Sequence, residues 1–143
     1  MINVLNTDIN LPKKNVSIKS SLYKDIIIDK LYIKNCVDMF ENNKNIKVNI
    51  DCNDSINLYY NESIIKQFLL DIISNSFKFN KEFGKINISC DESELKVYNT
   101  LSEDGELVND IKCLHNCFKI LNKPRINIEF IQKDYYQISI KFN

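Results

Sequence analysis

Glycine is almost absent from this chain: among 143 residues there are only two, Gly84 and Gly105. Loops that cradle phosphates need glycine, because their backbone approaches the phosphate closely and adopts positive φ angles. The sequence therefore leaves almost no room for a glycine-rich phosphate loop. Histidine is scarcer still, and a single residue, His115, argues against a zinc site.

Long apolar runs and an excess of either charge are also lacking. No run approaches the roughly 18 apolar residues of a membrane span, and the start MINVLNTDINLPKKN has no signal-peptide stretch. Lys+Arg and Asp+Glu both number 19, so the net charge is zero. A general nucleic-acid or anionic-membrane binder needs a basic face. We therefore expect a cytoplasmic protein with no nucleic-acid partner and no membrane partner.

The five cysteines form no C-x-x-C pair. They are Cys36, Cys52, Cys90, Cys113 and Cys117. Without that spacing and with one histidine in the chain, a metal site is not indicated. We expect five reduced thiols in a cytosolic protein, several of them in the core.

The chain divides into a leader and one domain. Residues 1–15 are polar and lack periodicity, so we expect a leader that is a candidate for disorder. Residues 16–143 show neither a repeat nor a linker, which predicts a single domain. Residues 16–44 are expected to be mostly helical, because apolar residues seven, four and three apart fall on one face. These are Ile26, Ile33, Val37 and Phe40. The run 25–29 could instead be a short strand.

Alternation of apolar and polar residues predicts six strands, each with one buried face. They cover residues 46–50, 56–60, 85–90, 94–99, 126–130 and 138–142, the last two as a hairpin. Two further helices are expected, a long amphipathic one over 62–79 with Asn61 as N-cap and a shorter one over 110–121. Alternating strands and amphipathic helices together predict an α+β two-layer sandwich, with helices on one sheet face and the other face at least partly wet.

A polar stripe runs along the 62–79 helix, opposite its apolar face. Gln67, Asp71, Asn75 and Lys78 are four, four and three residues apart, so they share one side. An amide oxygen can ligate Mg²⁺, a lysine can face a phosphate and an acid can take up a proton. The stripe could equally be the solvated face of an ordinary amphipathic helix.

The segment Gln67–Phe79, followed by Gly84–Ile88, resembles the N box of sensor histidine kinases, which reads roughly L-x-N-L-x-x-N-A-x-K-[YF]. The order of elements before it also fits, so the similarity spans about residues 16–143. The resemblance implies a Bergerat-type ATP-binding fold, in which a mixed, mostly antiparallel sheet of about five to six strands carries three helices on one face.

The resemblance also implies roles for individual residues. Asn75 matches the asparagine that holds Mg²⁺ against the ATP phosphates, and it would be a metal ligand only if ATP binds. Lys78 matches the basic residue near those phosphates. Asp71 stands where kinases usually have asparagine and where related ATPases carry a catalytic acid. It could act as a base, or it could be drift, so we name no catalytic residue.

The adenine-binding motif of that family, D-x-G-x-G, is altered here. Asn99 stands in place of the aspartate, and it accepts a hydrogen bond without the charge that would strengthen it. Leu101 and Glu103 replace both glycines. We expect their side chains to intrude where adenine would pack.

The second glycine motif, G-x-G-L, is altered as well. Ile111 and Cys113 replace its glycines, which would otherwise let the helix N-terminus meet the phosphates. The segment 101–110 is also short for an ATP lid. Asp71, Asn75, Lys78 and Asn99 are therefore expected to form a vestigial nucleotide site.

Two functions remain open. In the first, a degenerate histidine-kinase-like ATPase domain without ATP hydrolysis and without a cofactor acts as a protein-interaction or regulatory module in two-component-type signalling. By fold-level analogy its partner would be a kinase or a response regulator, docking around residues 101–114. In the alternative, the chain is an active Mg-ATP-binding catalytic domain with an atypical short lid. His115 lacks the following acid of a phosphoacceptor and is expected to be structural.

Overall fold

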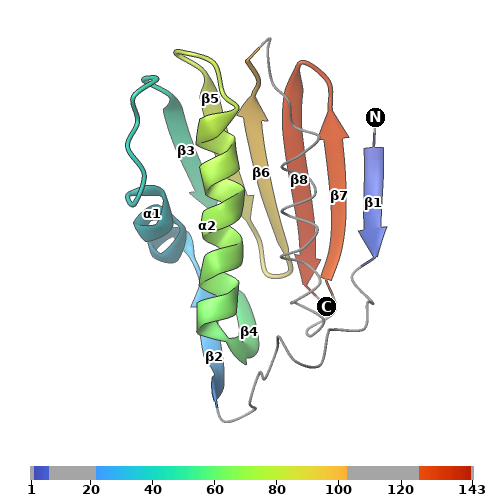
Figure 1. Ribbon diagram of the computed structural model, residues 1–143. Helices are drawn as coiled ribbons and strands as arrows, with labels where there is room; N and C mark the ends of the chain where they lie inside the picture. Colours follow the sequence, from blue (N-terminus) through green and yellow to red (C-terminus); the bar gives the residue numbers. More distant parts are fainter. Residues whose placement is uncertain (1, 7–21, 103–125, 143) are drawn as a thin grey trace, which may run out of the picture.

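The computed structural model describes residues 2–6, 22–102 and 126–142, which form eight strands and two helices (Figure 1). The strands are β1 (Ile2–Asn6), β2 (Tyr23–Ile28), β3 (Lys47–Cys52), β4 (Ile56–Asn61), β5 (Lys85–Cys90), β6 (Glu94–Thr100), β7 (Ile126–Gln132) and β8 (Tyr135–Phe142). The helices are α1 (Lys30–Val37) and α2 (Glu62–Lys78). The helix expected over 110–121 lies outside the described residues.

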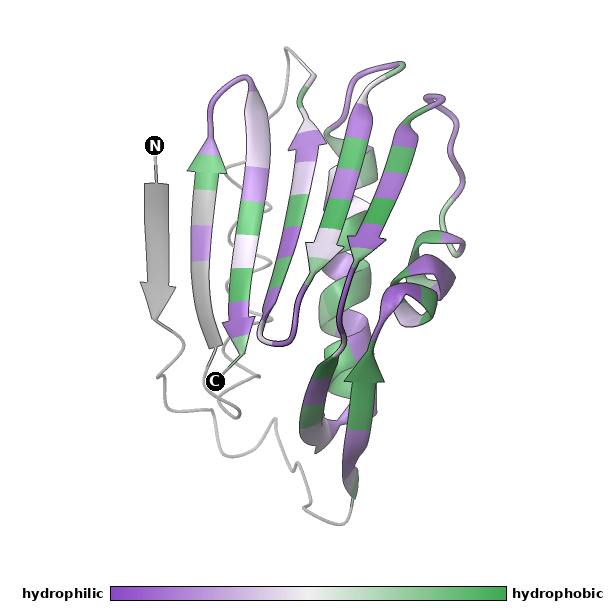
Figure 2. Ribbon diagram, turned by 180° about the vertical axis from the view of Figure 1, so that it is seen from behind, coloured by the Kyte–Doolittle hydropathy of each residue, from purple (hydrophilic) through white to green (hydrophobic). Residues whose placement is uncertain are grey.

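The main sheet has six strands in the order β1-β7-β8-β6-β5-β3. Only β3 and β5 run parallel, and every other neighbouring pair is antiparallel. Both described helices lie on one face of this sheet (Figure 1), while the view from behind shows strands that alternate between polar and apolar residues (Figure 2). The predicted α+β two-layer sandwich with a mixed, mostly antiparallel sheet is therefore confirmed.

One sequence-based expectation near the amino terminus was wrong, and the short strand left open for residues 25–29 is present in its place. Residues 16–44 are not mostly helical, because β2 occupies 23–28 and pairs antiparallel with β4 in a separate two-stranded sheet. Ile26 and Ile28 are buried and Ile27 is exposed, so the period is two here. Asp29 then starts α1 as N-cap, accepting a hydrogen bond from the Tyr32 N–H at 2.9 Å. Within the polar leader, residues 2–6 form β1, which pairs with β7 at the sheet edge.

Helix α2 follows its predicted boundaries closely. Asn61 is its N-cap, and its side-chain oxygen accepts a hydrogen bond from the Ile64 N–H at 3.3 Å. Its buried stripe packs against the inner face of the sheet. The buried residues of α2 are Ile65, Phe68, Leu69, Ile72, Ile73 and Ser76. Buried residues from β5, β6 and β8 complete the core below it, including Ile86, Ile88, Leu95, Val97, Ile138 and Ile140.

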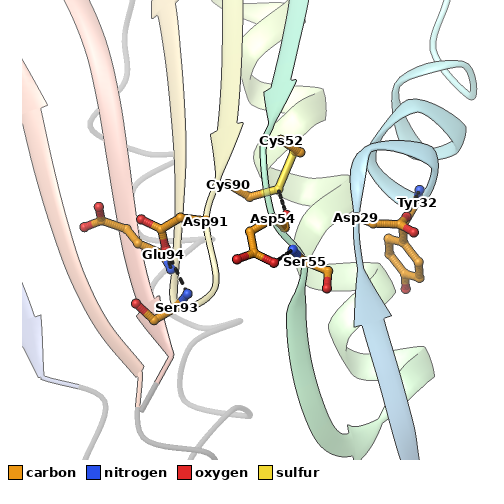
Figure 3. Close-up of a disulfide and its surroundings, with 9 residues drawn as sticks. All are labelled: Asp29, Tyr32, Cys52, Asp54, Ser55, Cys90, Asp91, Ser93 and Glu94. Atoms are coloured by element: carbon orange, nitrogen blue, oxygen red, sulfur yellow. Dashed lines mark hydrogen bonds between the residues drawn. A yellow bond between two sulfur atoms is a disulfide. The ribbon is translucent and has the colours of Figure 1, made fainter.

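The expectation of five reduced thiols was wrong for two of them, because Cys52 and Cys90 form a disulfide (Figure 3). They lie directly opposite each other at the carboxyl ends of the parallel strands β3 and β5. The bond joins the edge strand β3 to its neighbour β5. Next to it, the Asp91 carboxylate accepts hydrogen bonds from the Ser93 and Glu94 N–H groups at 2.9 and 2.8 Å (Figure 3). These bonds hold the pKa of Asp91 below its usual value.

The side chain of Asn80 ties the carboxyl end of α2 to β5 and β6. It is buried, and its NH₂ group donates to the backbone oxygens of Ser76 and Lys85 at 3.1 and 3.0 Å. Its oxygen accepts from the Lys81 N–H and the Thr100 hydroxyl at 2.9 and 2.5 Å. Both donor hydrogens and both acceptor positions of the amide are therefore used.

Gly84 is needed beside this amide. A β-carbon at Gly84 would overlap the Asn80 side-chain oxygen and the Thr100 hydroxyl oxygen. The Thr100 hydroxyl also accepts a hydrogen bond from the Lys85 N–H at 2.9 Å. One of only two glycines in the chain thus serves a close packing contact.

Lys44 closes the end of α2 from the other side. Its ammonium group donates to the carbonyl oxygens of Phe77, Lys78 and Asn80 at 3.4, 2.8 and 2.9 Å. The last carbonyls of a helix lack intrahelical partners and carry the negative end of its dipole. The loop before β3 therefore satisfies these groups with a cation.

We predict that Asn80→Asp lowers the free energy of unfolding by about 2–4 kcal/mol. The substitution replaces the NH₂ group by a carboxylate oxygen, which cannot donate a hydrogen bond to the Ser76 and Lys85 carbonyl oxygens. Urea unfolding should show a lower midpoint with an unchanged slope. The matched control is Asn57→Asp on the exposed side of β4, which should leave the midpoint almost unchanged. Equal midpoints for the two variants would contradict the role of Asn80.

Candidate functional site

Asp71 and Asn75 lie on the flank of α2 that points away from α1. Glu62 and Lys66 mark the opposite flank, since they line a cavity together with Tyr32 of α1. Asp71 follows Glu62 by nine residues and Asn75 follows Lys66 by nine. Nine residues are two and a half turns at about 3.6 residues per turn. Asp71 and Asn75 therefore lie on the side of the helix opposite Glu62 and Lys66. Both side chains are half-buried, unlike those of a freely solvated helix face.

A hydrogen bond joins the first two residues of the stripe, Gln67 and Asp71. The Gln67 side-chain NH₂ donates to a carboxylate oxygen of Asp71 at 2.9 Å. Lys78, at the end of α2, is exposed, and its ammonium nitrogen lies 5.1 Å from the centroid of the Phe79 ring. Lys78 also borders a cavity of about 310 Å³ between α2 and the loop before β3. It therefore faces a different region from the half-buried pair Asp71 and Asn75.

Asn99, expected at the adenine end of the site, is almost fully buried, with 1% of its surface exposed. It alternates along β6 with exposed or half-buried neighbours and shares the inner face with Leu95 and Val97. Its NH₂ group donates to the backbone oxygen of Thr100 at 2.9 Å. Asn99 thus lies on the sheet face that α2 covers, although its amide is engaged with its own strand.

The segment after β6 is fixed against the end of α2. Leu101, which stands at the first glycine of the family motif, packs against the hydrophobic core. The Ser102 N–H donates to the Phe79 carbonyl oxygen at 2.9 Å. The positions Glu103, Ile111 and Cys113 lie outside the described residues.

Sequence reasoning missed three residues that organise this region. Asn80, Thr100 and Lys44 connect the end of α2 to the strands and loops around it. A hint was available for Asn80, because an amide directly after a helix and four residues before a glycine is typical of a helix C-terminal turn. No signal in the sequence connected Lys44 to a helix that ends 34 residues later.

Comparison with known proteins gives a fold but no close relative. No family model and no curated protein matches the sequence. Among solved structures, the cytoplasmic segment of the histidine kinase QseC matches with a TM-score of 0.70 at 9% identity, covering 92% of this chain and 85% of that one. The catalytic domain of the histidine kinase ThkA matches with a TM-score of 0.63 at 17% identity, covering 83% and 96%.

The fold is that of histidine kinase catalytic domains. The Acinetobacter baumannii histidine kinase AdeS agrees, with a TM-score of 0.62 at 18% identity over 84% of this chain and 67% of that one. The predicted resemblance to the histidine-kinase-type ATPase fold is confirmed at the level of the fold. At these identities the likeness says nothing of the activity.

The described residues contain no cluster of three or more His, Cys, Asp or Glu side chains that could hold a metal ion. In the same part of the chain, neither helix has the length and apolar character required to cross a bilayer.

A small cavity separates α1 from α2 and has a polar atom without a partner. It measures about 220 Å³ and is lined in part by Tyr32, Cys36, Glu62 and Lys66. The Tyr32 hydroxyl oxygen is buried and makes no hydrogen bond within the described structure. Burial, followed by the nearby Cys36 and Glu62, raises the pKa of Tyr32 to about 12. Burial also raises the pKa of the Cys36 thiol, so this free cysteine is a poor nucleophile.

We predict that Tyr32 makes the fold sensitive to alkaline pH. An unfolded tyrosine ionises near pH 10, and the folded one near pH 12. The contribution of this raised pKa to the free energy of unfolding is therefore complete below pH 10 and is lost as the pH rises through 12. Tyr32→Phe should lose less stability over this range, and it should be at least as stable near neutral pH because it removes an unpaired buried hydroxyl.

Urea unfolding at several pH values measures this effect. The control is Tyr59→Phe, whose side chain is 62% exposed and should not change the pH profile. If Tyr32→Phe and the unmodified protein keep the same difference in unfolding free energy at every pH, ionisation of Tyr32 is not the cause.

Proposed function

We propose that this protein is a degenerate histidine-kinase-like ATPase domain that acts as a protein-interaction or regulatory module in two-component-type signalling. It works without ATP hydrolysis and without a bound cofactor. The observation that carries the proposal is the position of Leu101. Where the family has a glycine beside adenine, this chain has a half-buried leucine side chain that packs against the hydrophobic core.

The surroundings of Leu101 support the same conclusion. Asn99 replaces the charged aspartate, and its amide NH₂ already donates to the Thr100 carbonyl oxygen. The Ser102 N–H is bonded to the Phe79 carbonyl oxygen, and the Thr100 hydroxyl to Asn80. A segment fixed in this way cannot move aside for a nucleotide without breaking these hydrogen bonds, each worth about 1 kcal/mol.

A signalling protein is the partner we favour. One structure with the same fold is the histidine kinase ThkA in complex with the response regulator protein TrrA, with a TM-score of 0.59 at 16% identity. This chain covers 42% of that kinase chain. By analogy, the partner here would be a kinase or a response regulator, and the contact surface would include the region from Leu101 onward.

The alternative is an active Mg-ATP-binding domain with a short lid. Its support is the pair Asp71 and Asn75, half-buried together on one flank of α2. Their oxygen atoms are of the kind that Mg²⁺ prefers, and Asp71 could serve as a base. Asn75 would hold the ion against the phosphates, and Lys78 would lie near them only after turning from its contact with the Phe79 ring.

We predict that MgATP at millimolar concentration leaves the melting temperature unchanged. A ligand at about 100 times its dissociation constant would add roughly 2.7 kcal/mol of stability, which a thermal unfolding scan detects easily. No change supports the degenerate domain, in which Leu101 and the uncharged Asn99 stand where the family motif binds adenine.

Asn75→Ala is the control for this experiment. A clear rise in melting temperature with MgATP that disappears in Asn75→Ala would overturn the proposal and establish the alternative. A rise that persists in Asn75→Ala and without magnesium would place a nucleotide elsewhere on the protein.

A further inference from the structure

A third cavity lies beyond the carboxyl end of α2, at the end of the sheet where β6 stops and the β7–β8 turn begins. Figure 1 shows both at the same end of the sheet. The cavity measures about 410 Å³, within the usual range for small-molecule sites. It is lined by residues of the β6 end, by the turn residues 132–135 and by Lys81 of the loop after α2.

Two tyrosine rings form one side of this cavity. Tyr98 of β6 and Tyr135 of β8 lie with their ring centroids 5.1 Å apart and their planes tilted by 35°. Both are half-buried. Neither phenol hydroxyl is hydrogen-bonded to another residue of the described structure. The pair therefore offers an apolar surface on which a planar group can stack, with two hydroxyls ready to bond a ligand.

Two cations border the same cavity from different loops. Lys81 comes from the loop between α2 and β5, and Lys133 from the β7–β8 turn. Within the described part of the chain, neither ammonium group pairs with a carboxylate. Among the described residues of the lining, Asp134 is the one acidic side chain, beside the two lysines. The cavity favours an anion, which the unpaired lysines can approach from two sides.

We propose that this cavity binds a small aromatic anion, a planar ring carrying a phosphate or a carboxylate. The ring stacks on Tyr98 and Tyr135, and the anionic group lies between Lys81 and Lys133. Ser102 is also in the lining, and its hydroxyl would be a further donor to the anion. The site is separate from the flank of α2 that carries Asp71 and Asn75, neither of which lines it.

Phenyl phosphate is the smallest probe that contains both parts of this ligand. Titrated into the full chain and followed by amide chemical shifts, it should shift the signals of residues 98–102 and 132–135 with a dissociation constant of about 1 mM or lower. Inorganic phosphate and phenol each provide one half of the interaction, so each should bind about tenfold more weakly or worse. Benzoate should bind like phenyl phosphate.

Two sets of variants test the two halves. The double variant Lys81→Gln with Lys133→Gln changes exposed side chains and should weaken phenyl phosphate about tenfold while leaving phenol unchanged. Tyr135→Leu keeps the apolar bulk but removes the ring and the hydroxyl, and it should weaken both probes. Lys47→Gln on β3 removes an exposed lysine outside the cavity and is the matched control.

The source of the anion follows from one more titration. The probe is a short peptide containing phosphotyrosine. If it binds as tightly as phenyl phosphate, the ligand belongs to a protein. If it does not bind in the cavity, the ligand is a free small molecule. No shift of the cavity amides at about 10 mM phenyl phosphate, or binding that survives both sets of variants, overturns the proposal. Binding abolished by Asn75→Ala instead places the anion on α2 and also overturns it.

Discussion

The amide of Asn80 is the interaction on which the described structure depends most. A buried amide has two donor hydrogens and two acceptor positions, and here each has a partner in a different segment. Those partners belong to the end of α2, to the loop that follows it, and to the neighbouring strands β5 and β6. Because unpaired buried polar groups are costly, the four segments hold their relative positions together or lose them together. Gly84 and Lys44 complete this junction from either side.

The junction joins two elements that have different structural roles. Helix α2 is a core element, and its buried stripe from Ile65 to Ser76 has a structural reason to persist. The segment after β6 has a different role, since Leu101 packs against the edge of the core and the Ser102 N–H donates to the Phe79 carbonyl oxygen. The helix and this segment are therefore both held in place by the junction around Asn80.

Much of the fold could be predicted from periodicity because each strand has one wet face and α2 one buried stripe. The hairpin of β7 and β8 even pairs Ile128 with Ile140, as the alternation indicated. Local patterns failed where pairing is decided at a distance. The run 23–28 forms a strand because β4 is there to pair with it, and Cys52 meets Cys90 only through the register of β3 and β5. The positions of Asp71, Asn75 and Asn99 on α2 and β6 could be predicted, but the engagement of the Asn99 amide with its own strand could not.

The disulfide has a topological consequence for α2. With a sequence separation of 38, the bond between Cys52 and Cys90 closes a covalent ring that contains β4, the whole of α2 and β5. A ring of this kind restricts the unfolded chain more than the folded one. After a single backbone cut anywhere between these cysteines, the disulfide would still connect the two fragments. Helix α2, whose sequence resembles the N box, would then remain covalently linked to both parts of the chain.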